Sequence, residues 1–592
     1  MKLSIFTLLL LSAGSFGVSA TCQTETPVAA IQGVGQQSPL LNKTVSTSGV
    51  VTAVLYPGSK AAGVLLQSLT PDNNPKTSEA LFIADKELAR TAKPGQQLQV
   101  KGKVDELNGM TALVDVKTSV CGQQAAPTPF MAKLPVQSTQ DWEALEGQYL
   151  SFPQALIVND TYPLARYGEI LLADKRLWIA TDLYRPGKEA NQLEQQQQLS
   201  QLWLDDGIFE QNPDPVIFPD GNLSATNTVR IGDTVQNLQG YLIETQQGYR
   251  LVAAQRPEFV ATNARPAAPK AKAADHIRVA SFNVLNFFTG ETAASPFPTR
   301  RGATDANELQ RQQAKMIAAL SAMDADVIGL LEVENNGFAE RSALATLVRE
   351  LNKALGEQRY AFVQPQQALG GDAIKVALIY NQHKVTEAGK AVMITEGPFA
   401  YGSRAPLTQT FKAKSTESLF TVSVNHFKSK GSCPDKQSDT TDKGNRDNKD
   451  GQGCWNQSRV EAAKALTAWL KTQPTAVDTP HQLVIGDLNA YRQEDPIYTL
   501  EQAGWMHLAP RGEAGHYSYV FRGRTGSLDH ALASKSMAKH LTLFQHWNIN
   551  ADEPAVLDYN TEFKSKAQQQ SLYAPDPFRS SDHDPVLIDF KF

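Results

Sequence analysis

Two stretches near the end of the chain place reactive side chains beside apolar runs. Ser581-Asp582-His583 precedes the run Val586–Ile588, and Gly486-Asp487-Leu488-Asn489 follows Val484-Ile485. The first stretch joins a carboxylate to an imidazole. The second carries a carboxylate and an amide two residues apart, on one side of an extended segment. Such groups suit a hard metal ion and an attacking water, so we expect hydrolytic chemistry at the rim of a sheet.

Either stretch alone is a weak signal, because Asp-His pairs are common surface hydrogen bonds and Gly-Asp-Leu-Asn also suits a turn. The signal strengthens because four further apolar segments carry a polar residue at one end. The polar residues of all six segments are Asn283, Glu332, His426, Asp487 with Asn489, Asp529, and Asp582 with His583. A chance origin of this set is improbable, and the elements that position it are short buried strands.

This ordered set resembles the endonuclease/exonuclease/phosphatase superfamily, the fold of deoxyribonuclease I and exonuclease III, from about residue 277 to residue 592. The segments Ile328–Gly337, Val424–Gly431, Gly451–Asn456 and Gly486–Tyr491 look most like bacterial secreted nucleases of the ExeM/NucH type. The resemblance implies an α+β chain whose C-terminal part is a four-layer α/β sandwich. It leaves the substrate open, because inositol-lipid phosphatases and sphingomyelinases share the catalytic set.

Position by position, the resemblance implies a metal centre and a group that orients the reactants. Asn283 and Glu332 would hold a divalent metal, Mg²⁺ or Mn²⁺, with Asp582 nearby. Asp487 and Asn489 would orient the water and the scissile phosphate.

The resemblance also implies two histidines with different roles. His583 would be the central imidazole, with Asp529 fixing its tautomer and orientation. His426 would touch the phosphate or the leaving oxygen. No acidic residue is in clear register with His426, and Asp372 is the substitute that we expect.

Three further residues, Arg404, Lys428 and Asp372, are expected beside the substrate phosphate. Metal and imidazolium would offset the negative charge through which a phosphodiester resists hydrolysis. The chain contains no Gly-x-Ser-x-Gly elbow, no His-Glu-x-x-His helix and no Walker-type loop. Its four cysteines form no C-x-x-C pair, which disfavours zinc.

Length and charge describe a multidomain protein without a strong bulk attraction to nucleic acid. The 592 residues exceed what one core normally serves, and 56 Lys and Arg stand against 61 Asp and Glu. We predict a signal peptide over 1–20, an OB-like β domain over 21–130, a second β-rich domain over 131–262, a linker over 263–275 and the catalytic domain over 276–592.

The first β domain rests on five short strands, and a weak echo of their pattern near Gly232–Val252 leaves a second OB-like barrel open. The strands are expected over 45–54, 63–67, 80–84, 96–103 and 111–116. Two roles for the first β domain remain open, namely a packing or orienting module and a module that binds single-stranded nucleic acid. Binding would use aromatic side chains, and Tyr56 and Phe82 are the only evident aromatics between Cys22 and Cys121.

The N-terminus predicts export. Lys2, the apolar run Leu3–Leu11 and the small residues Val18–Ala20 form a signal-peptide pattern, and no later run is long enough to span a membrane. We expect a monomer that is released from the cell, with the periplasm as the alternative location.

Four cysteines in an exported chain favour two disulfides. Three pairings exist, and local pairing, Cys22 with Cys121 and Cys433 with Cys454, is the most economical. The second pair encloses the polar stretch 434–453, which we interpret as a substrate-facing loop or the holder of a structural Ca²⁺.

Together these features predict a secreted, divalent-metal-dependent nuclease that acts on extracellular DNA, with RNA as an alternative substrate. Two rivals remain. One is a phosphomonoesterase or phospholipid phosphodiesterase on the same fold, and the other is a non-catalytic nucleic-acid-binding matrix protein.

Overall fold

The computed structural model describes residues 22–125, 127–292, 295–367, 369–434, 444–510 and 516–592. The chain divides into two compact units. The first unit comprises Met1–Ala132, Gln137–Ser151 and Gln239–Ala254, and the second comprises Lys133–Val136, Phe152–Leu238 and Gln255–Phe592. The predicted signal peptide lies outside the described residues.

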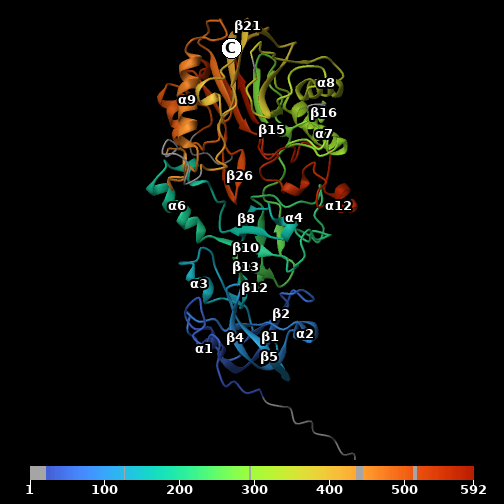
Figure 1. Ribbon diagram of the computed structural model, residues 1–592, viewed down its shortest axis with the longest axis vertical. Helices are drawn as coiled ribbons and strands as arrows, with labels where there is room; N and C mark the ends of the chain where they lie inside the picture. The colour runs from blue at the N-terminus through green and yellow to red at the C-terminus, as the bar shows by residue number, and fades with distance from the viewer. Residues whose placement is uncertain (1–21, 126, 293–294, 368, 435–443, 511–515) are drawn as a thin grey trace, which may run out of the picture. The chain divides into compact units, whose positions relative to one another are not determined.

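The first unit contains a closed five-stranded barrel in the order β1-β2-β3-β5-β4 (Figure 1). Its interior is lined by apolar side chains such as Val51, Leu66 and Val100. The five predicted strands are therefore confirmed, and the observed ones are β1 (Thr44–Leu55), β2 (Gly63–Gln67), β3 (Ala80–Ile83), β4 (Gln96–Leu107) and β5 (Met110–Gln123). Two short helices, α1 (Val28–Gln32) and α2 (Lys86–Thr91), complete this barrel.

Residues that follow the barrel also belong to the first unit. They form β6 (Phe130–Met131), α3 (Gln140–Glu143), β7 (Tyr149–Phe152), and the antiparallel strands β12 (Leu238–Thr245) and β13 (Gly248–Ala253). Ile243 and Val252 pack with Leu65 and Met110 of the barrel in one apolar cluster. Residues 131–262, for which one β-rich domain is expected, are divided between the two units.

The second unit is built on two six-stranded sheets. The first sheet has the order β19 (Tyr360–Phe362), β20 (Ile374–Asn381), β18 (Val327–Glu334), β15 (Ile277–Phe287), β30 (Val586–Phe590), β29 (Leu541–His546). The second has the order β21 (Val385–Met393), β22 (Leu407–Ala413), β23 (Leu419–His426), β24 (Gln482–Asp487), β28 (Asp529–Ala533), β25 (Met506–His507). A parallel pair stands near the centre of each, β15 with β18 and β23 with β24.

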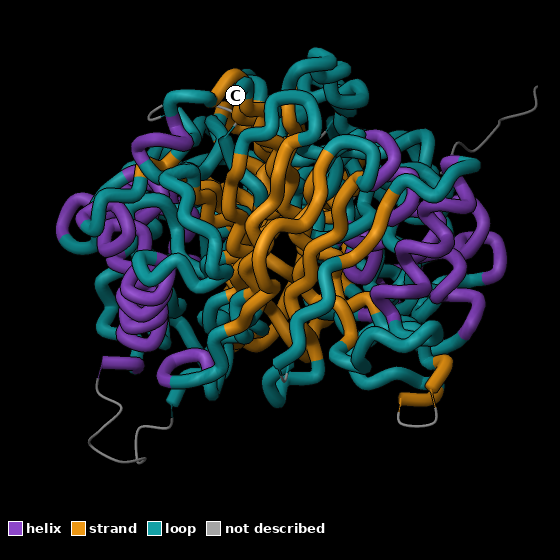
Figure 2. The backbone as a smooth tube through the Cα atoms, turned by 90° about the horizontal axis from the view of Figure 1, so that it is seen from above, coloured by secondary structure: helices purple, strands orange, loops and turns teal. Residues whose placement is uncertain are grey.

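The two sheets pack face to face, with helices on both outer sides (Figure 2). Strand residues alternate between the two faces: Phe282 of β15 packs toward the helices, whereas Val279 packs with Val424 and Ile485 of the other sheet. The helices are α7 (Ala306–Met323) and α8 (Ala343–Leu355) on the first sheet, and α9 (Asn456–Leu470) and α10 (Asp495–Gln502) on the second. The predicted mixed α/β fold of the C-terminal part is confirmed.

The long helices begin where the sequence provides caps. The side chain of Asp305 accepts a hydrogen bond from Glu308 N at the start of α7, and that of Ser342 accepts one from Ala345 N at the start of α8. Gly356, with φ 71°, ends α8. Shorter elements complete this part: β16 (Glu291–Thr292), β17 (Ser295–Pro296), β26 (Tyr519–Phe521), β27 (Arg524–Gly526), α11 (Lys535–Ala538), α12 (Lys566–Ser571) and the 3₁₀ helices η1 (Gly397–Phe399) and η3 (Ala555–Leu557).

The second unit also contains an antiparallel set of strands from before residue 262. Its order is β14 (Glu258–Val260), β11 (Thr234–Gln236), β8 (Leu156–Asp160), β9 (Ile170–Ala173), β10 (Gln201–Asp205), accompanied by α4 (Leu164–Tyr167), α5 (Ala180–Leu183) and α6 (Lys188–Gln198). Buried Arg230 forms ion pairs with Asp552 and Glu553, and Arg265 from the expected linker also pairs with Glu553. The expected linker, residues 263–275, therefore lies within the second unit and is bound to its C-terminal part through Arg265.

Both predicted disulfides are present, Cys22 with Cys121 and Cys433 with Cys454. Among the described residues, no helix combines the length and apolar character that crossing a membrane requires.

Candidate active site

Asn283 and Glu332 meet inside the parallel strands β15 and β18, where the strand pairing is irregular. Asn283 Nδ2 donates to Glu332 Oε1 at 3.2 Å, and the backbone N–H of Asn286 donates to Glu332 Oε2 at 3.1 Å. Glu332 has a φ of 63°, in the left-handed region, and the pairing of β18 with β20 shifts register between Leu330 and Val333. A left-handed conformation is costly for a residue with a side chain, so the local fold holds this carboxylate in a strained position.

The surroundings of Glu332 suit a cation. Burial raises the pKa of Glu332, and the nearby carboxylate of Asp582 raises it further. Ser581, whose hydroxyl donates to Asn283 O at 2.7 Å, fixes the segment that carries Asp582. Two neighbouring carboxylates with an amide oxygen form a hard donor set, so Asn283, Glu332 and Asp582 fit a divalent metal.

The second sheet contributes His426, Asp487 and Asp529 from adjacent strands. His426 is paired with Asp487 across β23 and β24, and Asp487 with Asp529 across β24 and β28. Gly486 makes the close strand contact feasible: its φ is 133°, and an added Cβ would lie 1.9 Å from the carbonyl oxygen of Asn425. The residue before Asp487 must therefore be glycine in this backbone.

Asp529 and His583 form a close contact at the centre of the site. His583 Nδ1 lies 2.7 Å from Asp529 Oδ2, and His583 Nε2 lies 4.0 Å from Asp487 Oδ2. Burial alone would lower the pKa of His583, but the carboxylates of Asp529, Asp582 and Asp487 raise it well above its usual value. The imidazole is consequently charged at neutral pH, with Nε2 on the side of Asp487.

Asp487 is buried between two histidines. Burial raises the pKa of Asp487 to about 7, Asp529 raises it as well, and His583 opposes the rise. Asn489, with φ 49°, donates its backbone N–H to Asp487 Oδ1 at 2.8 Å and its Nδ2 to Phe427 O at 3.1 Å. Asp487 is thus a carboxyl group that can exchange a proton near neutral pH.

His426 has the opposite charge state from His583. Burial lowers the pKa of His426 well below its usual value, and the charges of Arg404, His583 and Arg301 lower it further. Its Nε2 lies 3.4 Å from Asp487 Oδ2, and its Nδ1 is buried without a hydrogen-bond partner among the described residues. The expected pairing with Asp372 is therefore not made, because Asp372 is engaged elsewhere.

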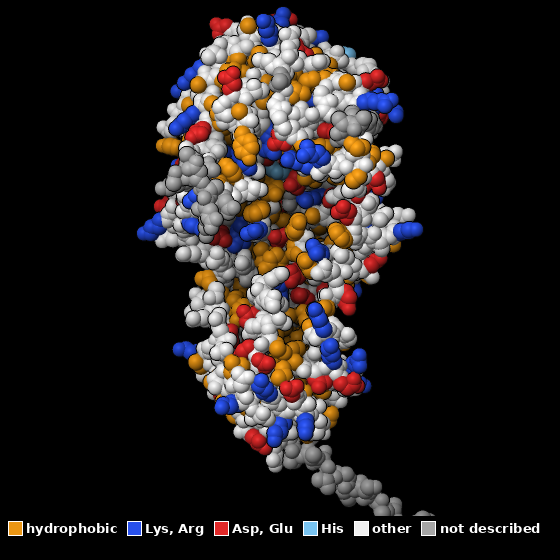
Figure 3. Space-filling view, in the orientation of Figure 1, with side chains coloured by type: hydrophobic (Ala, Val, Ile, Leu, Met, Phe, Trp, Pro, Cys, Tyr) orange, Lys and Arg blue, Asp and Glu red, His pale blue; other side chains and the backbone are white. Residues whose placement is uncertain are grey.

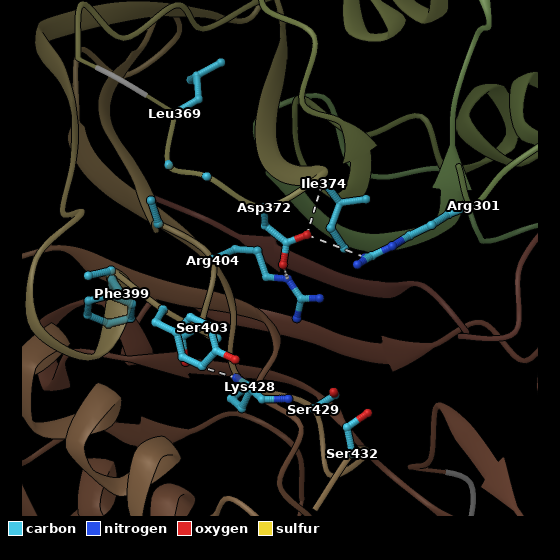
Figure 4. Close-up of a pocket in the computed structure, with 16 residues that line it drawn as sticks. Arg301, Leu369, Asp372, Ile374, Phe399, Ser403, Arg404, Lys428, Ser429 and Ser432 are labelled. Carbon is cyan, nitrogen blue, oxygen red and sulfur yellow. Dashed lines mark hydrogen bonds and ion pairs between the residues drawn. The ribbon is translucent and has the colours of Figure 1, made fainter. Parts of the chain in front are cut away.

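Asp372 stands between two arginines at the wall of a pocket of about 530 Å³ (Figure 4). Arg404 Nε lies 3.2 Å from Asp372 Oδ2, and Arg301 Nη1 lies 3.6 Å from Asp372 Oδ1. Lys428 lines the same pocket and donates its backbone N–H to Ser403 Oγ. The three residues expected beside the substrate phosphate, Arg404, Lys428 and Asp372, therefore line one pocket together with Arg301, for which the sequence had predicted no role at the site.

The pocket adjoins the strand end that carries His426. The backbone N–H of Arg404 donates to His426 O at 2.9 Å, and Arg404 Nη1 donates to Phe427 O at 3.3 Å. In Figure 3, Lys and Arg side chains gather beside a hollow in which acidic side chains and a histidine are also visible. Positive charge thus stands directly beside the buried carboxylate and imidazole groups.

Residues that flank the stretch enclosed by Cys433 and Cys454 lie at this pocket. Ser432 lines the pocket, and Lys428 Nζ lies 4.8 Å from the ring centre of Trp455. Buried Arg459 donates to Cys454 O at 2.9 Å, which anchors the end of the stretch. Residues 435–443, on which part of the substrate-loop and Ca²⁺ predictions falls, lie outside the described residues.

Two residues of the centre were missed at the sequence level. Ser518 Oγ donates to Asp529 Oδ2 at 2.7 Å, and the ring of Tyr519 lies 4.6 Å from the ring of His583. Tyr519 is the first residue of β26 and Ser518 directly precedes it, in a hairpin that joins β26 to β27 through a two-residue turn. These positions are not the ends of apolar strands from which the other site residues were predicted. The sequence around them carries no signal that would have indicated this role.

Comparisons with known proteins agree with the C-terminal location of the site. Residues 280–583, more than half of the chain, match the Endonuclease/Exonuclease/phosphatase family. A solved member of that family from Bacteroides thetaiotaomicron is 15% identical, with a TM-score of 0.34, and the match covers 53% of this chain and 97% of that chain.

Two further solved structures are similar over the same share of the chain. The human Nocturnin catalytic domain with bound sulfate is 15% identical, with a TM-score of 0.32 and coverage of 54% of this chain and 94% of that chain. A Bacteroides thetaiotaomicron mannosyl-6-phosphatase is 14% identical, with a TM-score of 0.32 and coverage of 53% and 100%. None of the curated proteins compared with the chain matches it.

Proposed function

Since this chain belongs to the endonuclease/exonuclease/phosphatase family, whose members are metal-dependent hydrolases of phosphodiester or phosphomonoester bonds, we propose that it is a secreted nuclease of the ExeM/NucH type that cleaves extracellular DNA. The observation that carries the proposal is the contact of Asp529 with charged His583, placed beside Asp487 and next to a cationic pocket. The two disulfides are compatible with an extracellular protein.

The residues divide the work of hydrolysis among them. Asp529 holds His583 through Nδ1, so that Nε2 of the imidazolium can neutralise a phosphoryl oxygen. Asp487, whose pKa is about 7, accepts a proton from the attacking water. Neutral His426, beside Asp487, contacts the phosphate or the leaving oxygen and orients it by hydrogen bonding.

Asn283, Glu332 and Asp582 are the residues that would hold Mg²⁺ or Mn²⁺. The bound metal supplies charge neutralisation for the phosphoryl group. Asn286 N–H and Asn283 Nδ2 keep the Glu332 carboxylate in place for this purpose.

The pocket of Arg301, Arg404 and Lys428 favours a polyanionic substrate. One acidic residue, Asp372, stands among these three cations, so the group keeps a positive charge. A nucleic acid offers phosphates on both sides of the scissile bond, and such a pocket can bind one of them.

The test is hydrolysis by the purified protein of circular plasmid, linear duplex, single-stranded DNA and RNA, with Mg²⁺, Mn²⁺, Ca²⁺ or a chelator. Nicked or linearised plasmid in Mg²⁺ or Mn²⁺, absent with chelator and absent in His583→Ala, is the expected result. Release of phosphate from small monoesters without DNA cleavage would contradict the proposal and favour a phosphomonoesterase.

A further inference from the structure

Four glutamates gather in the first unit, and the proposed hydrolysis uses none of them. Glu106 lies near the end of β4, Glu143 ends α3, Glu146 follows it, and Glu244 lies in β12. One carboxylate oxygen from each of Glu143, Glu146 and Glu244 lies within 4.8 Å of the other two. The charge of Glu106 is also close enough to raise the pKa of all three.

Glu146 has a carboxylate oxygen that no described group satisfies. Its side chain is fully buried, and its Oε1 accepts hydrogen bonds from Gln32 Nε2 at 3.1 Å and from the backbone N–H of Thr111 at 3.0 Å. Its Oε2 is buried and has no partner among the described residues. A buried, unpaired carboxylate oxygen is costly, and a bound cation would remove that cost.

No basic side chain neutralises the cluster. Within the described ranges, no Lys or Arg forms an ion pair with Glu106, Glu143, Glu146 or Glu244. Tyr249 donates its hydroxyl to Glu143 Oε2 at 2.9 Å. Burial, followed by the neighbouring carboxylates, raises the pKa of Glu146 well above its usual value. No ion pair with a described Lys or Arg therefore offsets the negative charge of these four glutamates.

The backbone leaves room for the carboxylate of Glu244. Gly109, at the tip of the β4–β5 hairpin, has a φ of 105°, and an added Cβ would lie 2.4 Å from Glu244 Oε2. Any side chain at position 109 would displace that oxygen. The hairpin tip of the barrel, the α3 segment and β12 thus converge on the same few oxygen atoms.

We propose that Glu143, Glu146 and Glu244 bind a divalent cation of the Ca²⁺ type, with Glu106 close by. Ca²⁺ accepts six to eight oxygen ligands at about 2.3–2.6 Å, so its ligand oxygens lie up to about 5 Å apart, as they do here. Ca²⁺ also accepts irregular carboxylate sets, whereas Mg²⁺ demands a smaller and near-ideal octahedron. The ion would tie the segment that contains α3 to β12, beside the tip of the β4–β5 hairpin.

Metal binding at this cluster can be separated from metal binding at the proposed active site. The full-length protein carrying Glu332→Gln, which weakens the active-site donor set, is titrated with Tb³⁺ and then with Ca²⁺. Tyr249, whose hydroxyl contacts Glu143, and Trp142, whose ring lies 6.3 Å from that of Tyr249, would sensitise Tb³⁺ luminescence. Glu244→Gln and Glu146→Gln are compared in this background with the control Glu87→Gln, an exposed acid of α2.

The expected result is sensitised emission that Ca²⁺ displaces, with affinity at least about tenfold weaker in Glu244→Gln and unchanged in Glu87→Gln. Calorimetry should show one Ca²⁺ equivalent fewer in Glu244→Gln. If Glu146→Gln does not fold, the Glu244→Gln variant alone tests the proposal, because Glu244 is partly exposed. Equal Ca²⁺ binding by Glu244→Gln and Glu87→Gln, or no binding at millimolar Ca²⁺, would overturn the proposal and leave a cluster that shares protons instead.

Discussion

Asp529 Oδ2 is shared by two donors, His583 Nδ1 at 2.7 Å and Ser518 Oγ at 2.7 Å. The carboxylate is therefore held from one side by the hydroxyl while it fixes the imidazole on the other. Since Nδ1 is occupied, Nε2 is the nitrogen of His583 left for chemistry. Several expected outcomes depend on this geometry.

Replacing the imidazole should abolish most hydrolysis without unfolding the chain. His583→Ala is expected to lower kcat by roughly 10²–10⁴-fold, because a positioned charge-stabilising group is lost. Asp529→Asn should lower kcat as well, and the double mutant should be little worse than His583→Ala, because the two side chains act as one unit. Steady-state kinetics and thermal unfolding measure this. Independent, multiplying losses would contradict the coupling.

Glu332→Gln tests the metal assignment. The amide keeps the shape of the carboxylate but loses its charge, so activity should fall and recover in part at higher Mg²⁺ or Mn²⁺ concentration. The control is Glu340→Gln, an exposed glutamate that follows the same strand. A metal dependence identical in the two variants would exclude Glu332 as a ligand.

Lys428→Gln tests the cationic pocket. Loss of one phosphate contact should raise KM for DNA and reduce the salt dependence of binding by about one ion, with a smaller effect on kcat. Lys353→Gln is the matched control, because Lys353 is exposed on α8 and pairs with Glu350. The measurement is KM and kcat across a salt series. An effect confined to kcat would assign Lys428 to the chemical step.

The disulfide between Cys433 and Cys454 should matter more for activity than for stability. Its loop of about twenty residues contributes roughly 3 kcal/mol in the chain-entropy account, and Ser432, which directly precedes Cys433, lines the pocket. Cys433→Ser with Cys454→Ser should raise KM for DNA, while the corresponding change at Cys22 and Cys121 should not. Unchanged KM and kcat in a folded double mutant would make the stretch a solvated insertion without a role in binding.

Asp182 should make the second unit less stable as pH rises. Burial raises its pKa to about 7, so between about pH 4 and pH 7 the folded state holds a proton that the unfolded state has lost. Stability therefore falls as pH rises through this window, and the destabilisation is complete above pH 7. Asp182→Asn should be the more stable protein at pH 8, by at most about 4 kcal/mol, with the difference vanishing near pH 4.

Denaturant unfolding at several pH values measures this effect. Asp182 Oδ1 accepts from the backbone N–H groups of Arg492 and Ser527, and the amide side chain of the Asp182→Asn variant would keep that acceptor oxygen. The control is Asp478→Asn, the same substitution at an exposed aspartate. A pH-independent change in Asp182→Asn would show that the proton is not the cause.

The strand ends could be read from sequence because a buried strand followed by a polar residue has few interpretations. His426 and Asp487 stand at such ends, whereas Asn283 and Glu332 lie inside β15 and β18 at irregularities of the strand pairing. Parallel pairing brings the strands of each pair together. The five barrel strands were predictable for the same reason, since turn residues separate short β-branched runs. Whether the barrel is of the OB type, and what it binds, remain predictions.

The remaining features of the site and the division into units depend on contacts between distant segments, which the local sequence pattern does not encode. Asp372 pairs with Arg301 and Arg404 rather than with His426, and this follows from the path of loops that have no periodicity. Ser518 reaches Asp529 only because a hairpin folds back beside β28. The division of residues 131–262 likewise reflects which core the apolar side chains of β12 and β13 enter.

The reactive groups are distributed over both sheets of the second unit. Asn283 and Glu332 stand on the first, His426, Asp487 and Asp529 on the second, and the segment with His583 leads into β30 of the first. The apolar side chains packed between the two sheets hold these two groups of residues close together. A chain whose two sheets are not packed against each other consequently lacks the complete set of these groups. A cell that exports such a protein unfolded would carry no working phosphodiesterase inside.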